Sequence, residues 1–215
     1  MPIKCKSLDH SGGYYFYRIH RLKSDELNNS FASLKKFLHD VFEERPDSYF
    51  RNGPRSSKLK FNIPGLDIKG VTGHEVCQLT SLGLEENHER YKTNHSKVQV
   101  FMLERDDKTL AVEVPIWLNA NELDHYEAFF QSKEPLTGHI DVLRFEDGKI
   151  WVWDYKPNAV KEKYAATQVN FYALMLSKRT GISLDQFRCG YFDSAYAFMF
   201  KPTEKVLTEV NESLL

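Results

Sequence analysis

Two aspartates and a lysine near the middle of the chain have the types and spacing of a catalytic metal site. Asp141 and Asp154 lie on either side of an Asp147-Gly148 pair, which separates two runs rich in β-forming residues. Such a pair predicts a two-residue β-hairpin turn. Pairing counted outward from this turn places Asp141 directly opposite Asp154. Lys156 follows two residues after Asp154, so the pleat of the strand points it to the same face.

The opposed carboxylates predict a site for a divalent cation. Directly opposed side chains on paired strands have Cβ atoms roughly 4.5–5.5 Å apart, where two like charges are destabilising. A hard cation such as Mg²⁺ binds carboxylate oxygens and removes this repulsion. A bound cation activates water and polarises a phosphoryl oxygen. Lys156 would stabilise charge on the phosphate, and it would also help to deprotonate water if its pKa were depressed. These parts indicate metal-dependent hydrolysis of a phosphodiester.

Two elements must position these groups. Residues 150–156 are apolar on both faces until the end of the run, which is typical of a central strand covered on both sides. The pattern then becomes helical, and we expect a helix over residues 165–179. Gln168 and Tyr172 lie four residues apart and share a face of this helix. Gln168 is a candidate to hold Lys156 or a water, whereas Tyr172 either packs in the core or contacts the substrate.

The rest of the pattern predicts one α/β domain. Helical periodicity covers residues 31–42, 73–81 and 84–103, although the last six residues of the third stretch also fit a strand. Strand patterns cover residues 110–117 and 189–200. We therefore expect a sheet that contains the hairpin, with helices packed against it. The last ten residues predict a tail or a short docking helix.

The first 70 residues form a basic and aromatic segment, which we expect to pack on a core of residues 71–215. They carry 13 Lys and Arg against eight Asp and Glu. Their aromatic opening is ambiguous between strand and helix, and Pro and Gly punctuate residues 45–70, so a mostly helical and loop portion is expected. Cations among aromatics fit a surface that tracks phosphates and stacks bases, although a solvated loop is the plainer alternative. The candidate substrate-binding residues here are Arg51, Arg55 and Lys58.

Three short motifs resemble the RecB-like branch of the PD-(D/E)XK nuclease superfamily. They are G-H-I-D at residues 138–141, D-Y-K at 154–156 and Q-V-N-F-Y at 168–172. Each is weak alone, but their order and the hairpin turn between the first two make the resemblance specific. It covers residues 113–181, about a third of the chain. The resemblance implies a restriction-endonuclease-like fold, with a central mixed sheet flanked by helices.

The resemblance also implies roles for individual residues. In the family the two acidic residues bind metal, the lysine is catalytic and the glutamine supports the site. These roles fall on Asp141, Asp154, Lys156 and Gln168. Tyr172 is the last residue of the third motif and a candidate substrate contact. The implied cofactor is Mg²⁺ or Mn²⁺, and the implied substrate is DNA, either single-stranded or at double-stranded ends.

The family also has a metal-binding histidine on an upstream helix, for which two positions compete. His74 keeps the family's glycine four residues before it, at Gly70, whereas His88 lies on the better predicted helix and is slightly preferred. His95 lies seven residues further on, roughly on the same face. Each histidine is otherwise an ordinary surface or hydrogen-bonded residue. Glu113 resembles an acidic residue that precedes the G-x-I-D strand, so it either adds or orients a metal ligand or is an edge-strand charge.

Composition excludes several other classes. The three cysteines are isolated, so this chain alone has no four-cysteine iron–sulfur cluster of the kind some family members carry. A Walker A motif is absent, which predicts a stand-alone nuclease module or a subunit of a larger assembly, with a protein partner or as a homo-oligomer. No signal-peptide pattern or membrane-length apolar run occurs, so we expect a cytoplasmic protein that does not contact membranes.

The leading hypothesis is a Mg²⁺- or Mn²⁺-dependent deoxyribonuclease, an exonuclease in DNA repair, recombination or defence. One alternative is a non-catalytic nucleic-acid-binding module of the same fold, against which the intact acids and lysine speak. A glycoside hydrolase with paired carboxylates is a second, and Lys156 argues against it. A purely structural hairpin held by salt bridges is the third, but two acids opposite one lysine leave a charge uncompensated.

Overall fold

A single mixed sheet runs through the computed structural model, which describes residues 2–10, 13–27 and 29–205. Its strands follow the order β1-β2-β4-β5-β6-β7-β8-β3, and all neighbours are antiparallel except the parallel pair β6 and β7. This confirms the predicted α/β fold with a central mixed sheet. The strands are β1 (Ile3–His10), β2 (Gly13–His20), β3 (Lys69–Thr72), β4 (Thr109–Leu118), β5 (Leu136–Glu146), β6 (Lys149–Tyr155), β7 (Phe187–Phe192) and β8 (Tyr196–Phe200).

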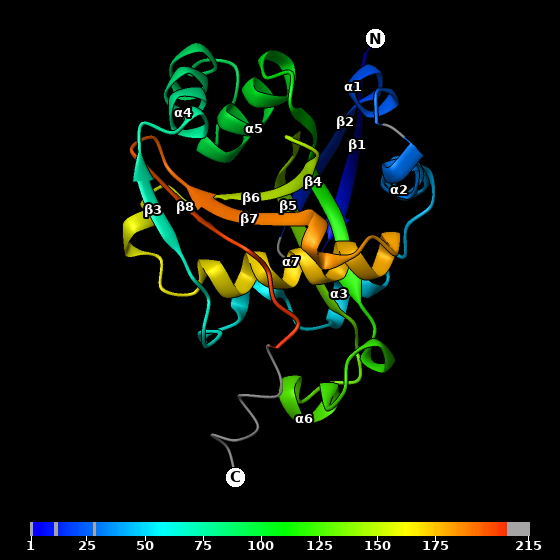
Figure 1. Cartoon of the computed structure of the whole chain (residues 1–215). Coiled ribbons are helices and arrows are strands. Elements are labelled where there is room, and N and C mark those ends of the chain that lie inside the picture. Colours follow the sequence, from blue (N-terminus) through cyan, green and yellow to red (C-terminus); the bar gives the residue numbers. More distant parts are fainter. Residues whose placement is uncertain (1, 11–12, 28, 206–215) are drawn as a thin grey trace.

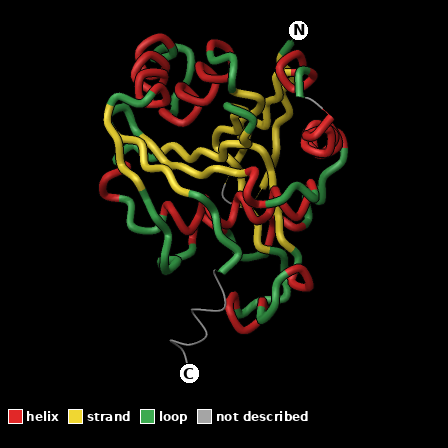
Figure 2. Tube along the Cα trace, in the orientation of Figure 1, coloured by secondary structure: helices red, strands yellow, loops and turns green. Residues whose placement is uncertain are grey.

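Helices cover both faces of the sheet, as Figures 1 and 2 show. The helix α7 connects β6 to β7 and packs with α2 over one face, where it contributes to the larger apolar cluster. The pair α4 and α5 covers the other face and encloses a second apolar cluster. The helices are α1 (Arg21–Asp25), α2 (Ala32–Glu43), α3 (Tyr49–Asn52), α4 (Glu75–Glu86), α5 (Asn94–Arg105), α6 (Tyr126–Phe130) and α7 (Ala165–Thr180).

The two long helices that the periodicity predicted over residues 31–42 and 165–179 are confirmed as α2 and α7. The predicted helix over residues 84–103 is divided, because α4 ends at Glu86 and α5 begins only at Asn94. The side chain of Thr93 accepts a hydrogen bond from the Ser96 amide at 3.1 Å and so caps a new helix. The last part of the stretch is helix rather than the alternative strand.

The N-terminal portion contains helices and loops as expected, but its ambiguous aromatic opening forms the hairpin of β1 and β2. β2 pairs with β4 through Arg18 opposite Val112 and Ile19 opposite Ala111. The hairpin therefore extends the same sheet that carries the predicted site. The division of the chain at residue 70 remains a prediction, and the expected tail at residues 206–215 lies outside the described residues.

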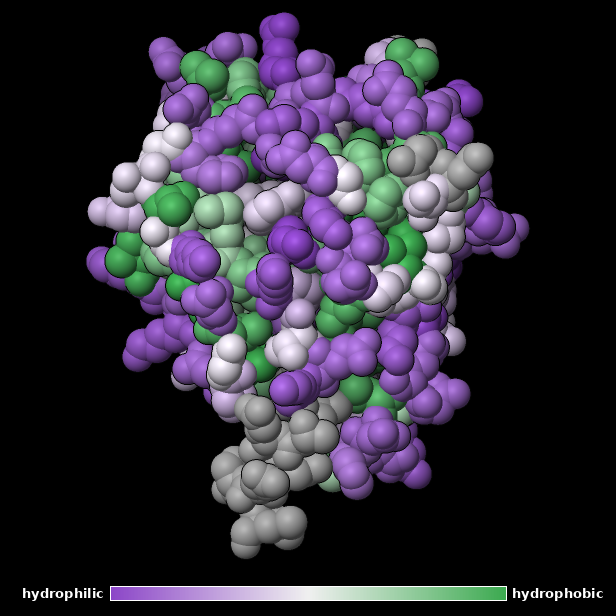
Figure 3. Space-filling model, viewed as in Figure 1, coloured by the Kyte–Doolittle hydropathy of each residue, from purple (hydrophilic) through white to green (hydrophobic). Residues whose placement is uncertain are grey.

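Polar side chains cover most of the face seen in Figure 3, with apolar residues visible between them. The large apolar side chains lie mainly in the two clusters against the sheet. No helix within the described ranges is both long and apolar enough to cross a membrane.

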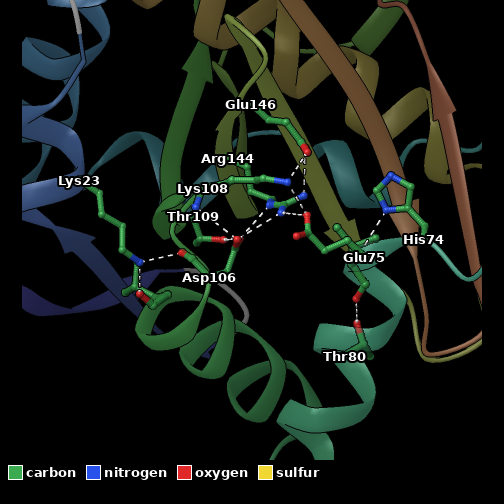
Figure 4. Close-up of polar contacts among 11 residues, drawn as sticks. Lys23, His74, Glu75, Thr80, Asp106, Lys108, Thr109, Arg144 and Glu146 are labelled. Carbon is green, nitrogen blue, oxygen red and sulfur yellow. Dashed lines mark hydrogen bonds and ion pairs between the residues drawn. The ribbon is translucent and has the colours of Figure 1, made fainter.

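Arg144 on β5 ties the ends of α4 and α5 to the sheet, as Figure 4 shows. Its side chain is fully buried, and its Nε donates to Asp106 Oδ2 at 2.8 Å while its Nη2 donates to Glu75 Oε2 at 2.6 Å. Lys108 adds hydrogen bonds to Glu75 at 2.8 Å and to Glu146 at 2.6 Å. Buried charges are costly unless they are paired and hydrogen-bonded. This network therefore holds the N-terminal end of α4 and the C-terminal end of α5 against β5.

We predict that Arg144→Ala lowers the free energy of unfolding by about 3–5 kcal/mol, because it leaves the buried Asp106 carboxylate without its partner. Urea denaturation measures the change. The matched control is Arg90→Ala, which removes an exposed bidentate pair with Glu104 and should cost about 0–1 kcal/mol. Similar losses in the two variants would contradict a stabilising role for the buried network.

Candidate active site

The β-hairpin that carries the two aspartates has the predicted register. β5 and β6 pair from Glu146 opposite Lys149 to Val142 opposite Trp153. Asp147 and Gly148 form the turn with φ angles of 51° and 69°, the left-handed values that a two-residue type I′ turn requires. The next position in this register is Asp141 opposite Asp154, so the turn arithmetic is confirmed.

At this position the Asp141 carboxylate takes over a backbone contact. Asp141 Oδ2 accepts a hydrogen bond from the Tyr155 amide at 2.9 Å. Asp141 and Asp154 retain only 8% and 2% exposure. Burial, together with the charge of Asp154, raises the pKa of Asp141 well above its usual range. Ionising both carboxyl groups together is therefore unfavourable unless additional positive charge joins the site.

Lys156, just after β6, and Gln168 of α7 contact the carboxylate of Asp154. Lys156 Nζ lies 2.7 Å from Asp154 Oδ2 and donates to Gln168 Oε1 at 3.0 Å. Gln168 Nε2 contacts both Asp154 Oδ1 at 3.1 Å and the Tyr172 hydroxyl at 2.7 Å. Four of the residues singled out in the sequence thus form one hydrogen-bonded chain. Tyr172 is buried and also lines the site, so its packing and its polar contact coexist.

The structure does not favour one of the two roles that the sequence left open for Lys156, that of a lysine with a depressed pKa which deprotonates water. Burial works to lower the pKa of Lys156, but the charges of Asp154 and Asp141 outweigh it, and the pKa is raised. The neighbouring carboxylates therefore do not favour a neutral lysine that could act as a base. Lys156 is held as a cation instead.

Glu113 lies beside Asp141 on the neighbouring strand. β4 is inside the sheet between β2 and β5, so the edge-strand interpretation of this charge is wrong. Its φ angle of 53° is unusual for a residue other than glycine, and such backbone strain concentrates at functional sites. Gln99 Nε2 on α5 donates to Glu113 Oε1 at 2.9 Å. Burial, and then the charge of Asp141, raises the pKa of Glu113 to about 8.

The structure places His95 at the site, and not His74 or His88, the two candidate metal ligands from the sequence. His88 has a 71% exposed side chain and contacts Glu89. His74 caps α4 by accepting from the Val76 amide at 3.3 Å. Neither lines the cavity with the carboxylates, whereas His95 does, with Nε2 3.7 Å from Asp141 Oδ2. The break between α4 and α5 explains the difference, because it gives the first turn of α5 its own direction.

His139 lines one side of the site, although the sequence analysis did not propose it as a site residue. Its Nε2 lies 2.8 Å from His10 Nδ1, and His10 Nε2 lies 3.0 Å from Asp47 Oδ1. Burial lowers the pKa of His139 well below its usual range, so the ring is neutral. The Tyr15 ring stacks on the His139 ring, with 3.9 Å between the ring centroids. A signal was available, since His139 precedes Asp141 by two residues and alternation predicts the same face.

These groups surround a cavity of about 310 Å³. Arg55 reaches it from the N-terminal portion and donates to the Tyr15 hydroxyl at 2.7 Å. Lys58 lines an adjoining groove instead. Arg51 lies on the short helix α3 and lines neither space. The cavity is lined by Tyr15, Arg55, Ser57, Thr93, His95, Glu113, His139, Asp141, Asp154, Lys156, Gln168 and Tyr172.

The donor set fits a hard cation with few protein ligands. Within the described part of the chain, no group of three or more His, Cys, Asp or Glu side chains is arranged to hold a metal. Mg²⁺ commonly binds through one or two carboxylates and keeps several waters. Asp154 Oδ2 is buried and accepts no hydrogen bond of good geometry from the residues that the structure describes, although it lies 2.7 Å from the Lys156 ammonium. Asp141 and Asp154 are therefore suited to bind one ion, with Glu113 and His95 beside them.

Gly138 has a steric reason to be glycine, from which we derive a prediction. A Cβ atom at this position would lie 2.3 Å from Tyr172 Cε1 and 2.6 Å from Ser56 Oγ. Gly138→Ala should therefore displace Tyr172 and lower the free energy of unfolding by about 1–3 kcal/mol. Gly138→Val should lower it further. Thermal denaturation measures both, and an unchanged midpoint would show that Tyr172 does not depend on this close approach.

The comparison with known protein families agrees with this geometry. A family model for the PD-(D/E)XK nuclease superfamily matches residues 13–213, nearly the whole chain. None of the curated proteins matches it at a significant level. Members of this superfamily are nucleases, generally hydrolases, and they use divalent metal ions. The extent of the match and the site together show that the chain belongs to the PD-(D/E)XK nuclease superfamily.

Proposed function

We propose that this chain is a Mg²⁺- or Mn²⁺-dependent, RecB-like deoxyribonuclease that acts as an exonuclease in DNA repair, recombination or defence. The observation that carries the proposal is the convergence of two buried carboxylates and one lysine on a single cavity. The three residues are Asp141, Asp154 and Lys156. The family match supports the nuclease activity, and the order of the three sequence motifs supports the RecB-like branch.

Each side chain then has a distinct task. Asp141 and Asp154 would hold the cation, which when bound lowers the pKa of a water and polarises a phosphoryl oxygen. Lys156 stays protonated and stabilises the charge that grows on the attacked phosphate. Gln168 holds Lys156 and Asp154 through its two amide atoms, so that both keep their orientation. Arg55 at the cavity is suited to bind a neighbouring phosphate.

A non-catalytic nucleic-acid-binding module is the alternative function. It has no need for a carboxylate pair that raises the pKa of one member, nor for a lysine held against the other. Such charges are costly to bury without a purpose or a partner. The arrangement therefore favours the catalytic proposal.

We expect cleavage of linear DNA with Mg²⁺ or Mn²⁺ and none with EDTA. Asp154→Asn and Lys156→Ala should lower the rate by about 10²–10³-fold, because each removes a charge that acts on the transition state. His95→Ala should also lower the rate, whereas His88→Ala, at an exposed turn, should leave it unchanged. A fluorescent gel assay under single-turnover conditions measures these rates.

Cleavage of linear but not covalently closed circular DNA would support exonuclease action. The catalytic proposal is wrong if metal-dependent cleavage is absent, or if it survives both Asp154→Asn and Lys156→Ala. Equal losses in His95→Ala and His88→Ala would contradict the assignment of His95 to the site.

A further inference from the structure

A second, larger groove adjoins the catalytic cavity. It has a volume of about 800 Å³ and is formed by residues 52–55, 58–61 and 128–132. Arg55 lines both spaces. The groove and the catalytic cavity therefore lie on either side of Arg55.

The backbone around Arg55 fixes the groove relative to the catalytic strand. The Thr137 amide donates to the Pro54 carbonyl at 2.9 Å, and Ser56 Oγ donates to the Thr137 carbonyl at 2.7 Å. Arg55 and Thr137 also form a parallel β-bridge. Thr137 lies four residues before Asp141 on β5. A ligand seated in the groove is thus held in a fixed position relative to the carboxylates.

The charge of the groove is suited to a phosphate backbone. Arg55, Lys58 and Lys60 line it, and none of its lining residues is acidic. Lys58 and Lys60 are exposed, and neither forms an ion pair within the described residues. A groove with three basic side chains and no acidic one in its lining attracts polyanions through phosphate contacts and counterion release.

One side of the groove is aromatic. Phe61, Phe129 and Phe130 line it and are only partly buried. Phe61 and Phe129 meet edge to face with ring centroids 4.9 Å apart, and Phe129 meets Phe130 in the same way at 5.0 Å. Aromatic rings beside cations are the features that bind unpaired bases by stacking. A duplex keeps its bases stacked inside and presents mainly phosphates, so it has little use for such a wall.

We propose that this groove binds an unpaired nucleic acid strand on its way to or from the catalytic cavity, an inference that rests on the proposed nuclease function. Arg55, Lys58 and Lys60 contact successive phosphates, and a base stacks on Phe129. Phe129 belongs to α6, in the segment between β4 and β5, so that segment supplies part of the substrate site.

Binding of a fluorescein-labelled oligothymidylate, measured by anisotropy in EDTA, tests the cations without cleavage. The double variant Lys58→Ala/Lys60→Ala should raise the Kd about tenfold. It should also reduce the slope of log K against log salt by roughly 1.4, since each phosphate contact contributes roughly 0.7 on single strands. The matched control is Lys69→Ala/Lys201→Ala, in a basic groove that shares no residue with the cavity, which should change the Kd less than twofold.

Phe129→Ala tests the aromatic wall. It should weaken binding of the oligothymidylate about tenfold and leave binding of a blunt duplex unchanged. Phe16→Ala removes a phenylalanine that is 41% exposed on β2 and serves as the control, with thermal denaturation to verify that each variant is folded.

Three results would overturn this inference. They are no binding of the oligothymidylate by the wild-type protein, equal effects in the groove variants and their controls, and equal loss of single-stranded and duplex binding in Phe129→Ala. These results differ from failure of the proposed function. Oligothymidylate binding that depends on Lys58, Lys60 and Phe129, without cleavage in Mg²⁺ or Mn²⁺, would support the groove and contradict the nuclease.

Discussion

The opposition of two like charges is the constraint on which the site depends. The tight turn at Asp147 and Gly148 sets a register that leaves Asp141 and Asp154 facing each other where β5 and β6 stop pairing. Two charges about 5 Å apart repel by roughly 1–3 kcal/mol at effective dielectric constants between those of water and a protein surface. Burial strengthens the conflict, and the single cation of Lys156 does not cancel both charges. A divalent ion is the partner that resolves it.

Helices on both faces of the sheet hold the strands and side chains around the two carboxylates in position. On one face, α7 supplies Gln168 and Tyr172, and the missing side chain of Gly138 lets Tyr172 approach β5. On the other, Arg144 fastens α4 and α5. The helix α5 then carries Gln99 to Glu113 and His95 to Asp141. The Arg144 network at the far end of α5 therefore helps to determine which side chains surround the carboxylates.

The parts of this structure that local rules govern were predictable from the sequence. The turn chemistry gave the hairpin register, and the apolar periodicity gave α2 and α7. The N-terminal hairpin was not predictable, because its aromatic residues suit either a strand or a helix until β4 is available for pairing. His95 was underrated because the Thr93 cap interrupts a pattern that reads as one helix. The aromatic wall at Phe129 depends on packing between segments far apart in the chain.

Anomalous diffraction from crystals containing Mn²⁺ can locate the divalent ion that we expect Asp141 and Asp154 to share. We expect one anomalous peak that is coordinated by oxygens from both carboxylates, and its loss in Asp154→Asn crystals. A peak at His74 or His88 instead would contradict a shared ion at the two aspartates. So would no peak between the aspartates at Mn²⁺ concentrations that support cleavage.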